Sequence, residues 1–168
     1  MKLLTAILLF LLAAEAPAFD ASAWLKRRQQ FTQEAERLRA AYTNVVAQVK
    51  EPAEDLFVPL EEHPDGSVKT GLSAKRAQIF IDEGLVWAKD VVLRQHDERR
   101  AETLRIEAEA LVFDRKARRG WAEGPAKVTR GKTSFSGRNV FFSSEEEYVL
   151  SFESSFFESR DLKAGGDL

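Results

Sequence analysis

The chain has 168 residues, of which 44% are hydrophobic and 31% are charged, and its formal net charge is −2. It contains no cysteine and two histidines, which excludes a disulfide scaffold, thiolate metal sites, thiol catalysis and a multi-histidine metal site. The slight negative charge argues against general nucleic-acid binding, which needs excess Lys and Arg to neutralise phosphates. We therefore expect no nucleic-acid partner and no cofactor, in a chain long enough for one domain with its own core.

Residues 1–18 have the pattern of a secretory signal peptide. Lys2 precedes an apolar run over residues 3–14, and Ala16-Pro17-Ala18 places small residues on both sides of a cleavage site. The run is shorter than the ~20 residues that a membrane-spanning helix needs. We predict cleavage after Ala18 and export to the periplasm. An uncleaved leader would instead anchor the chain in the inner membrane.

Residues 19–51 are predicted to contain an amphipathic α-helix. Ser22 is a candidate N-cap, and Pro52 marks the end of the helical pattern. The polar face carries charges of both signs, so we expect the helix to pack on the following domain or on its own copy. A helix that binds a partner or a membrane surface is the alternative. The apolar positions recur at helical spacings and are Trp24, Phe31, Ala35, Leu38, Tyr42, Val45 and Val49.

From residue 52 to residue 162 the pattern is that of β-strands, and residues 163–168 are predicted to be a flexible tail. Apolar residues at 56–60, the turn residues His63-Pro64-Asp65-Gly66 and the alternation over 68–74 together predict a β-hairpin. A second alternating segment lies near the C-terminus, over residues 148–156. The clearest strand lies between them, and a period of two places on one of its faces Leu104, Ile106, Ala108, Ala110 and Val112.

The strands repeat along the chain. The pair Trp87-Ala88 recurs 34 residues later as Trp121-Ala122, and Ala74 and Ala108 have the same separation. Ala108 and Gly137 are 29 residues apart. A period that drifts between these values indicates a stack of strand pairs joined by loops of variable length.

These repeated strands resemble a known family. The segments at 108–116, 122–124, 128–130 and 135–142 are similar to the OstA-like domain of the periplasmic lipopolysaccharide-transport proteins LptA and LptC. Pro64-Asp65-Gly66 and the strand that follows resemble the opening strands of the LptC type, so the resemblance spans residues 56–160. The chain departs from the family at Pro125, where Asn is usual, and in the helix at 24–49, which the usual domain lacks.

The resemblance implies a mainly β chain, an OstA-like β-jellyroll of antiparallel strand pairs preceded by the helix. In such a domain lipid acyl chains lie between two facing sheets, and copies or homologues stack through open sheet edges. Small side chains among larger ones would leave room for a lipid, whereas in an ordinary sandwich the same residues fill the core. The candidate groove-lining residues are Ala74, Ile106, Ala108, Ala110, Val112, Phe135, Gly137, Leu150 and Phe152.

Candidate phosphate-binding, metal-binding and catalytic motifs in the sequence are incomplete. Gly131-Lys132-Thr133 lacks the earlier glycine of a phosphate-binding loop and is expected to be a hairpin turn. His96-Asp97-Glu98 offers metal ligands without a second histidine nearby in the sequence, so we expect a solvated loop. The basic residues at 115–119 form a turn that is either solvated or in contact with lipid phosphates. No nucleophile and base are recognisable as a pair, so we expect no enzyme.

The leading hypothesis is therefore a non-enzymatic carrier that binds the lipid A part of lipopolysaccharide and passes it from the inner to the outer membrane. Its partners would be other jellyroll domains that pair with its edge strands, at residues 56–74 or 148–157, and a homo-oligomer is the alternative assembly. A structural module of the cell envelope that assembles through its helix or its sheet edges is the competing hypothesis. An envelope enzyme is the weakest.

Overall fold

The computed structural model describes residues 20–145, 148–153 and 155–159, and the predicted signal peptide and C-terminal tail lie outside these ranges. Within them, no helix combines the length and apolar character needed to cross a membrane. The chain divides into two compact units, Met1–Gln30 and Phe31–Leu168. In the first unit the described residues are helical from Ala21 onward. All strands belong to the second unit.

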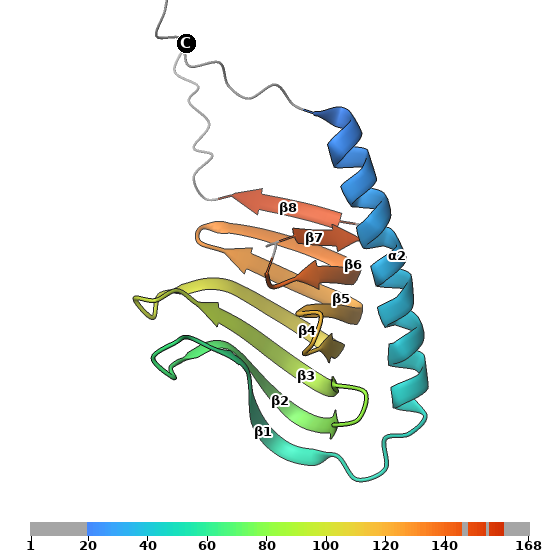
Figure 1. The fold of residues 1–168 in the computed structure, drawn as a ribbon, viewed down its shortest axis with the longest axis vertical. Coiled ribbons are helices and arrows are strands. Elements are labelled where there is room, and N and C mark those ends of the chain that lie inside the picture. The colour runs from blue at the N-terminus through green and yellow to red at the C-terminus, as the bar shows by residue number, and fades with distance from the viewer. Residues whose placement is uncertain (1–19, 146–147, 154, 160–168) are drawn as a thin grey trace, which may run out of the picture. The chain divides into compact units, whose positions relative to one another are not determined.

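Among the described residues, one helix precedes a single antiparallel sheet (Figure 1). Helix α2 spans Ala21–Val46. The strands pair in chain order from β1 to β7, and β8 pairs with β6 beside β7. Their bounds are β1 Ala53–Glu62, β2 Val68–Phe80, β3 Leu85–His96, β4 Glu102–Asp114, β5 Arg119–Arg130, β6 Thr133–Ser143, β7 Tyr148–Ser151 and β8 Ser155–Ser159.

Helix α2 begins at a carboxylate cap. The Ala23 N–H donates to Asp20 Oδ1 at 3.0 Å, which satisfies one of the amides that the first helical turn leaves unpaired. The cap is thus Asp20, two residues before the Ser22 that the sequence pattern suggested. The helix ends at Val46, and Gln48 and Val49 donate back to the carbonyl of Val45.

From Phe31 onward, the apolar face of α2 packs on the sheet. The Phe31 and Phe141 ring centroids are 5.7 Å apart, and Leu38 is fully buried. An ion pair of 2.9 Å joins Arg37 to Asp114 at the end of β4. The prediction that the helix packs on the following domain is confirmed. The shared cluster is formed by Phe31, Ala35, Leu38, Val45, Phe80, Leu85, Trp87, Val112, Trp121 and Phe141.

The predicted hairpin forms between β1 and β2. The His63 N–H donates to the carbonyl of Ser67 at 2.8 Å, and Gly66 adopts a φ of 80° that favours glycine. The Asp65 carboxylate accepts hydrogen bonds from the hydroxyl and amide of Ser67, which lowers the pKa of Asp65. The turn chemistry that the sequence indicated is therefore the chemistry that closes the hairpin.

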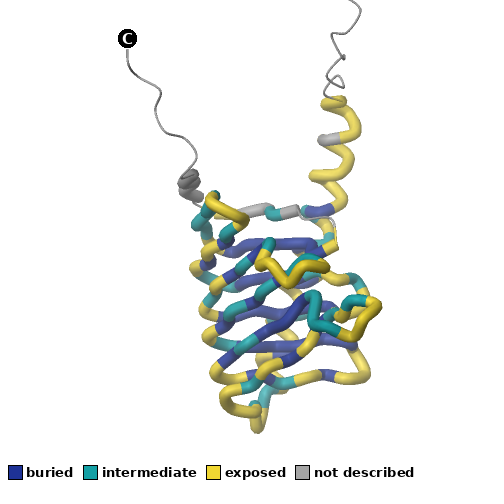
Figure 2. Tube along the Cα trace, turned by 90° about the vertical axis from the view of Figure 1, so that its left-hand side faces the viewer, coloured by how far each residue is buried: buried dark blue, intermediate teal, exposed yellow. Residues whose placement is uncertain are grey.

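A crease crosses the sheet and changes which residues face the core. Asp90 in β3, Gly124 in β5 and Asn139 in β6 have left-handed backbones, with φ of 52°, 77° and 54°. The strand register also shifts between Ala108 and Ala110. On β3, for example, the inward positions are Val86 and Ala88 before the crease and Val91 and Leu93 after it. Figure 2 shows the resulting succession of buried and exposed positions along the strands.

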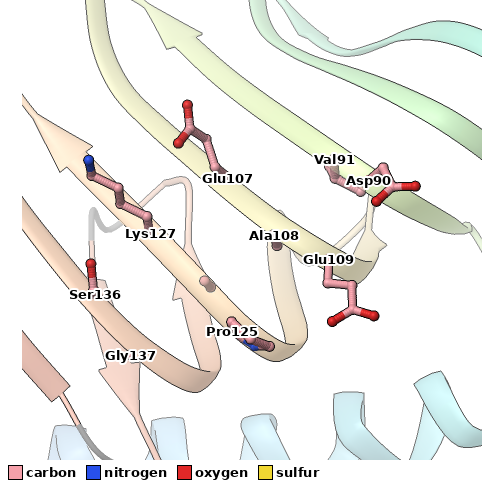
Figure 3. Close-up of a pocket in the computed structure, with 10 residues that line it drawn as sticks. Asp90, Val91, Glu107, Ala108, Glu109, Pro125, Lys127, Ser136 and Gly137 are labelled. Atoms are coloured by element: carbon pink, nitrogen blue, oxygen red, sulfur yellow. The ribbon is translucent and has the colours of Figure 1, made fainter.

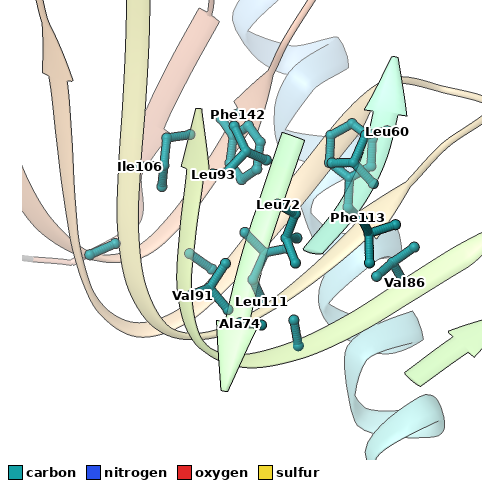
Figure 4. Packing of buried hydrophobic residues seen from close by; sticks show 14 of the residues in the cluster. Leu60, Leu72, Ala74, Val86, Val91, Leu93, Ile106, Leu111, Phe113 and Phe142 are labelled. Carbon is teal, nitrogen blue, oxygen red and sulfur yellow. The ribbon is translucent and has the colours of Figure 1, made fainter. Parts of the chain in front are cut away.

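The sheet folds over on itself along this crease. Gln95 near the end of β3 donates to the carbonyl of Ser144 beyond β6 at 3.1 Å, although β4 and β5 lie between these strands in the sheet. One cluster of buried side chains fills the enclosed side, with Leu60, Leu72, Phe113 and Phe142 among its members (Figure 4). The predicted fold class, a mainly β jellyroll of repeated antiparallel strand pairs after one amphipathic α-helix, is confirmed.

The helix–sheet contact predicts a large loss of stability when it is truncated. Leu38→Ala should lower the free energy of unfolding by about 2–5 kcal/mol, because it leaves a cavity between α2 and the sheet. Gln33→Ala, at an exposed position of the same helix, should change it by less than about 0.5 kcal/mol. Urea unfolding followed by tryptophan fluorescence measures both. Equal effects of the two changes would mean that α2 does not contribute to the folded domain.

Candidate functional site

The inner face of the jellyroll carries two rows of side chains that run across the strands. The strand register places residues of one row opposite one another on successive strands. The first row is mostly large and consists of Val58, Leu72, Leu93, Ile106, Val128 and Phe135. The second row, beside the crease, is mostly small and consists of Leu56, Ala74, Val91, Ala108, Ala126 and Gly137.

The sequence repeat produces this arrangement. Trp87 and Trp121, which are 34 residues apart, both lie in the cluster under α2, and the alanines that follow them both lie in the inner core. Ala74, Ala108 and Gly137, the other repeated positions, belong to the small row. The interpretation as stacked strand pairs is confirmed.

Five of the nine predicted groove residues belong to these two inner rows. Ile106 and Ala74 are 0% and 7% exposed and belong to the core, and Ala108 and Phe135 are partly buried against it. Gly137 is partly exposed at the end of the small row. Their contact with a lipid stays a prediction, because Ala74 and Ile106 are enclosed by protein side chains and Ala108 and Gly137 line a hollow at the crease.

The expectation that Leu104, Ile106, Ala108, Ala110 and Val112 share one face is wrong. The facing residues of β4 change after Ala108, at the crease that it shares with β3, so Leu111 and Phe113 join the inner core while Val112 lies in the cluster under α2. Ala110, which precedes Val112 by two residues, is buried and pairs with Glu123. A period of two cannot reveal this, because the change of face occurs at a bend of the backbone that the residue pattern does not mark.

The last two predicted groove residues lie near the C-terminal end of the described chain. The backbone of Leu150 pairs with Phe141, and its side chain lies outside the described residues. Phe152 is 39% exposed, and its ring centroid lies 5.4 Å from that of Trp121. Since Trp121 packs under α2, Phe152 lies on the helix-covered side of the sheet and away from the inner core.

A hollow of about 590 Å³ lies at the crease, over strands β3 to β6 (Figure 3). Ala108, Ala126 and Gly137 line its floor, and the exposed Glu107 and Glu109 side chains project around it. Its described lining includes no member of the large inner row. It does include four members of the small inner row, Val91, Ala108, Ala126 and Gly137, beside the exposed Glu107 and Lys127, so residues of both faces of the sheet line this hollow.

A second hollow of about 320 Å³ continues along the crease over β1 to β3. The two hollows share Asp90, whose left-handed backbone lies between them. Tyr42 of α2 is near Glu109, at the edge of the larger hollow, and near Glu123. Its burial raises its pKa, and these two carboxylates add to the effect. The two hollows thus have a mainly apolar lining, with Asp90, Glu107 and Glu109 among their charged residues.

The two histidines of the chain lie close together, which the sequence did not indicate. His63 Nε2 donates to the backbone carbonyl of His96 at 3.2 Å, so the expectation of no second histidine near His96 is wrong in three dimensions. Both line a hollow of about 430 Å³ with Asp97 and Glu98. Among the described residues, however, no group of three or more His, Asp or Glu side chains is arranged to hold a metal ion. Gly131 and Lys132 form the turn between β5 and β6, as expected.

Two polar residues that organise the fold were missed in the sequence. Asn139 is buried, accepts a hydrogen bond from the Gly124 N–H at 2.9 Å and donates to Glu153 at 2.6 Å, so it joins β5 to the segment between β7 and β8. The sequence indicated the role of Asn139 only weakly, since Asn tolerates the left-handed backbone region but also occurs in many other backbone conformations. The second is Glu61, which pairs with Arg118 at 3.1 Å. Nothing in the sequence indicated this role, because a carboxylate at the end of an apolar strand is normally solvated.

No protein-family model matches the chain, and no curated protein matches it. Among solved structures, the chain is similar to LptH, the LptA homologous periplasmic component of the lipopolysaccharide transport device from Pseudomonas aeruginosa. The sequences are 11% identical, the match covers 62% of this chain and 82% of the other, and the TM-score is 0.47. At this level the likeness assigns neither a family nor a function.

We predict that side chains on the inner side of the crease are tightly packed. Ala126→Leu should lower the free energy of unfolding by about 1–3 kcal/mol, because Ala126 is 6% exposed and the added atoms must displace neighbours. Lys127→Leu, one residue along and facing outward, is the matched control and should have little effect. Urea unfolding measures both. If Ala126→Leu costs nothing, the inner side of the crease holds the free space that a lipid groove requires.

Proposed function

We propose that the chain is a non-enzymatic lipid-binding protein of lipopolysaccharide transport, which carries or bridges the lipid between the two membranes of a cell envelope. The observation that carries this proposal is the placement of the residues behind the OstA-like resemblance. They fall on the β1–β2 turn, on β2 and on the consecutive strands β4, β5 and β6 of a folded-over sheet with an apolar inner face. A function that depends on shape and apolar surface fits a chain with no recognisable catalytic group.

The proposed ligand contact is the inner face. The acyl chains of lipid A would lie along the row of Ile106, Val128 and Phe135, where burial of apolar area drives binding. The described core is filled by the protein's own side chains, so a lipid must separate the two folded halves to enter. The predicted contacts at Ala74, Ile106, Ala108, Phe135 and Gly137 lie on this face.

The proposed protein partners are other jellyrolls that pair with the β1 edge. β1 ends the sheet, and Phe57 on this strand is 54% exposed. At the opposite edge, β6 is paired by the short strands β7 and β8, which makes a broken edge that is less suited to pairing. We therefore favour residues 56–74 over 148–157 as the docking edge, with self-association through it as the alternative. The proposed location is the periplasm, through the predicted signal peptide at 1–18.

A structural or interaction module of the cell envelope is the second candidate. The observation in its favour is the filled core, in which Ile106, Phe113 and Phe142 are all 0% exposed. A domain of this kind would bind proteins through its edge and hold no lipid.

Photo-crosslinking from two adjacent positions separates these candidates. With p-benzoylphenylalanine at Phe135, which faces inward and is already aromatic, irradiated cells should yield a protein–lipopolysaccharide adduct that an antibody to lipid A detects. The same group at Ser136, which pairs with the outward-facing Lys127, is the matched control and should yield at least about tenfold less, because successive strand residues face opposite sides.

Equal yields at the two positions, or no adduct at either, would contradict lipid binding between the sheets. A protein adduct from position 57, obtained without any lipid adduct from position 135, would favour the interaction module.

A further inference from the structure

Five polar residues from separate parts of the sheet meet at one mouth of the jellyroll. We call them the polar latch: Glu61 of β1, Thr70 of β2, Gln95 of β3, Arg118 of the β4–β5 turn and Ser144 beyond β6. β1 and β6 are separated by four strands in the sheet. The latch therefore joins the two folded halves through side chains, across a gap that no β-ladder spans.

Glu61 is the centre of the latch. Its carboxylate accepts a hydrogen bond from Thr70 Oγ1 at 2.6 Å and pairs with Arg118 Nε at 3.1 Å. Ser144 Oγ lies 3.5 Å from the same carboxylate and donates to the backbone carbonyl of Arg118 at 3.1 Å. The Glu61 side chain is only 8% exposed. Leu60, the preceding residue, belongs to the inner core (Figure 4). The carboxylate thus lies at the rim of the apolar interior and depends on its partners for stabilisation.

Arg118, the cation that pairs with Glu61, is open to solvent. The Arg118 side chain is 46% exposed, and its Nη1 lies 3.6 Å from the exposed carboxylate of Glu145. A guanidinium binds phosphate in the same two-pronged way as it binds a carboxylate. An anionic group arriving from solvent can therefore reach Arg118 without first entering the protein.

The latch also contains an unsatisfied group. Gln95 Nε2 donates to the carbonyl of Ser144, but Gln95 Oε1 is buried and has no hydrogen-bond partner. A buried polar atom without a partner costs free energy, so the closed mouth is not optimised for stability alone. This is expected of an element that also has to open.

We propose that Arg118 is a binding site for the anionic head group of an amphiphile, and that exchange of Glu61 for this head group opens the latch. The inference rests on the proposed function, since it assumes that an acyl chain enters between the two halves. Binding of the phosphate at Arg118 releases Glu61 from its cation, and the mouth beside Leu60 opens to the attached acyl chain. The latch thereby admits anionic lipids in preference to neutral ones.

Two fluorescent probes with the same acyl chain test this, a lysophosphatidic acid and a monoacylglycerol, mixed with the full chain in a stopped-flow fluorimeter. We expect uptake of the anionic probe to be at least about fivefold faster, the lower end of typical coupling between two sites. Arg118→Gln should reduce this preference to less than about twofold, because it removes the head-group contact. Glu61→Gln should accelerate the neutral probe by at least about fivefold, because the latch is released in advance.

Matched controls lie beside both residues. Glu62→Gln and Arg115→Gln make the same chemical changes at exposed neighbours and should leave both rates within about twofold of the unmodified chain. Ser144→Ala removes a hydroxyl that contacts both Glu61 and the Arg118 carbonyl across the latch, and it keeps the test valid if Glu61→Gln does not fold, with acceleration of the neutral probe expected again. Near-ultraviolet circular dichroism establishes which variants are folded.

Inorganic phosphate distinguishes a free anion from a lipid head group. If phosphate accelerates the neutral probe in the unmodified chain but not in Arg118→Gln, the anion alone opens the latch. If it has no effect while the anionic probe keeps its preference, the head group acts as part of the lipid. Both results support the site.

A preference that survives Arg118→Gln, or a neutral-probe rate that neither Glu61→Gln nor Ser144→Ala changes, would overturn the latch and leave lipid carriage intact. Failure of every folded variant to take up either probe would overturn both proposals.

Discussion

The crease across the sheet is the constraint on which the inner face depends. In a straight strand every second side chain points into the core. In β3 and β6 this alternation shifts by one residue at Asp90 and Asn139, whose backbones have a positive φ. A residue other than glycine stays in that region only if its surroundings hold it. Asn139 is held by hydrogen bonds to Gly124 and Glu153 on either side. Because the inward set changes at the crease, the bent strands keep apolar side chains inside along most of their length.

The same crease marks the limit of what could be predicted from the sequence. Strand pairing was readable because it depends on local turn chemistry, as at Asp65 and Gly66, and on a 34-residue repeat that places Trp87 and Trp121 alike. The orientation of Val112 was not readable, because the step that reverses it lies in the backbone near Glu109. The contact of Glu61 with Ser144 joins residues 83 positions apart and leaves no periodic signal. Local chemistry thus predicted the elements, and tertiary contacts decided their faces.

Helix α2 explains why one part of the sheet can be apolar on both sides. Without the helix, outward aromatic and branched side chains such as Phe80, Val112 and Phe141 would be exposed to solvent. The helix covers them from Phe31 onward. The Arg37–Asp114 ion pair, at 2.9 Å, fixes the helix at the end of β4, where Asp114 also accepts the amides of Lys116 and Ala117. Beyond the crease the outward residues include charged ones such as Glu107 and Lys127, and no such cover is needed.

A carrier of apolar cargo has to satisfy two opposed requirements: an interior that is stable when empty and accessible when cargo arrives. Large side chains such as Leu72 and Phe142 fill the interior here, so in the proposed carrier access would come from movement of the two halves and not from a permanent cavity. In the proposed carrier, closure would fall to the rim opposite the crease, where Glu61 and Arg118 meet. An ion pair suits that position better than apolar packing, since an anion from solvent can replace one partner, whereas packed side chains have no such competitor.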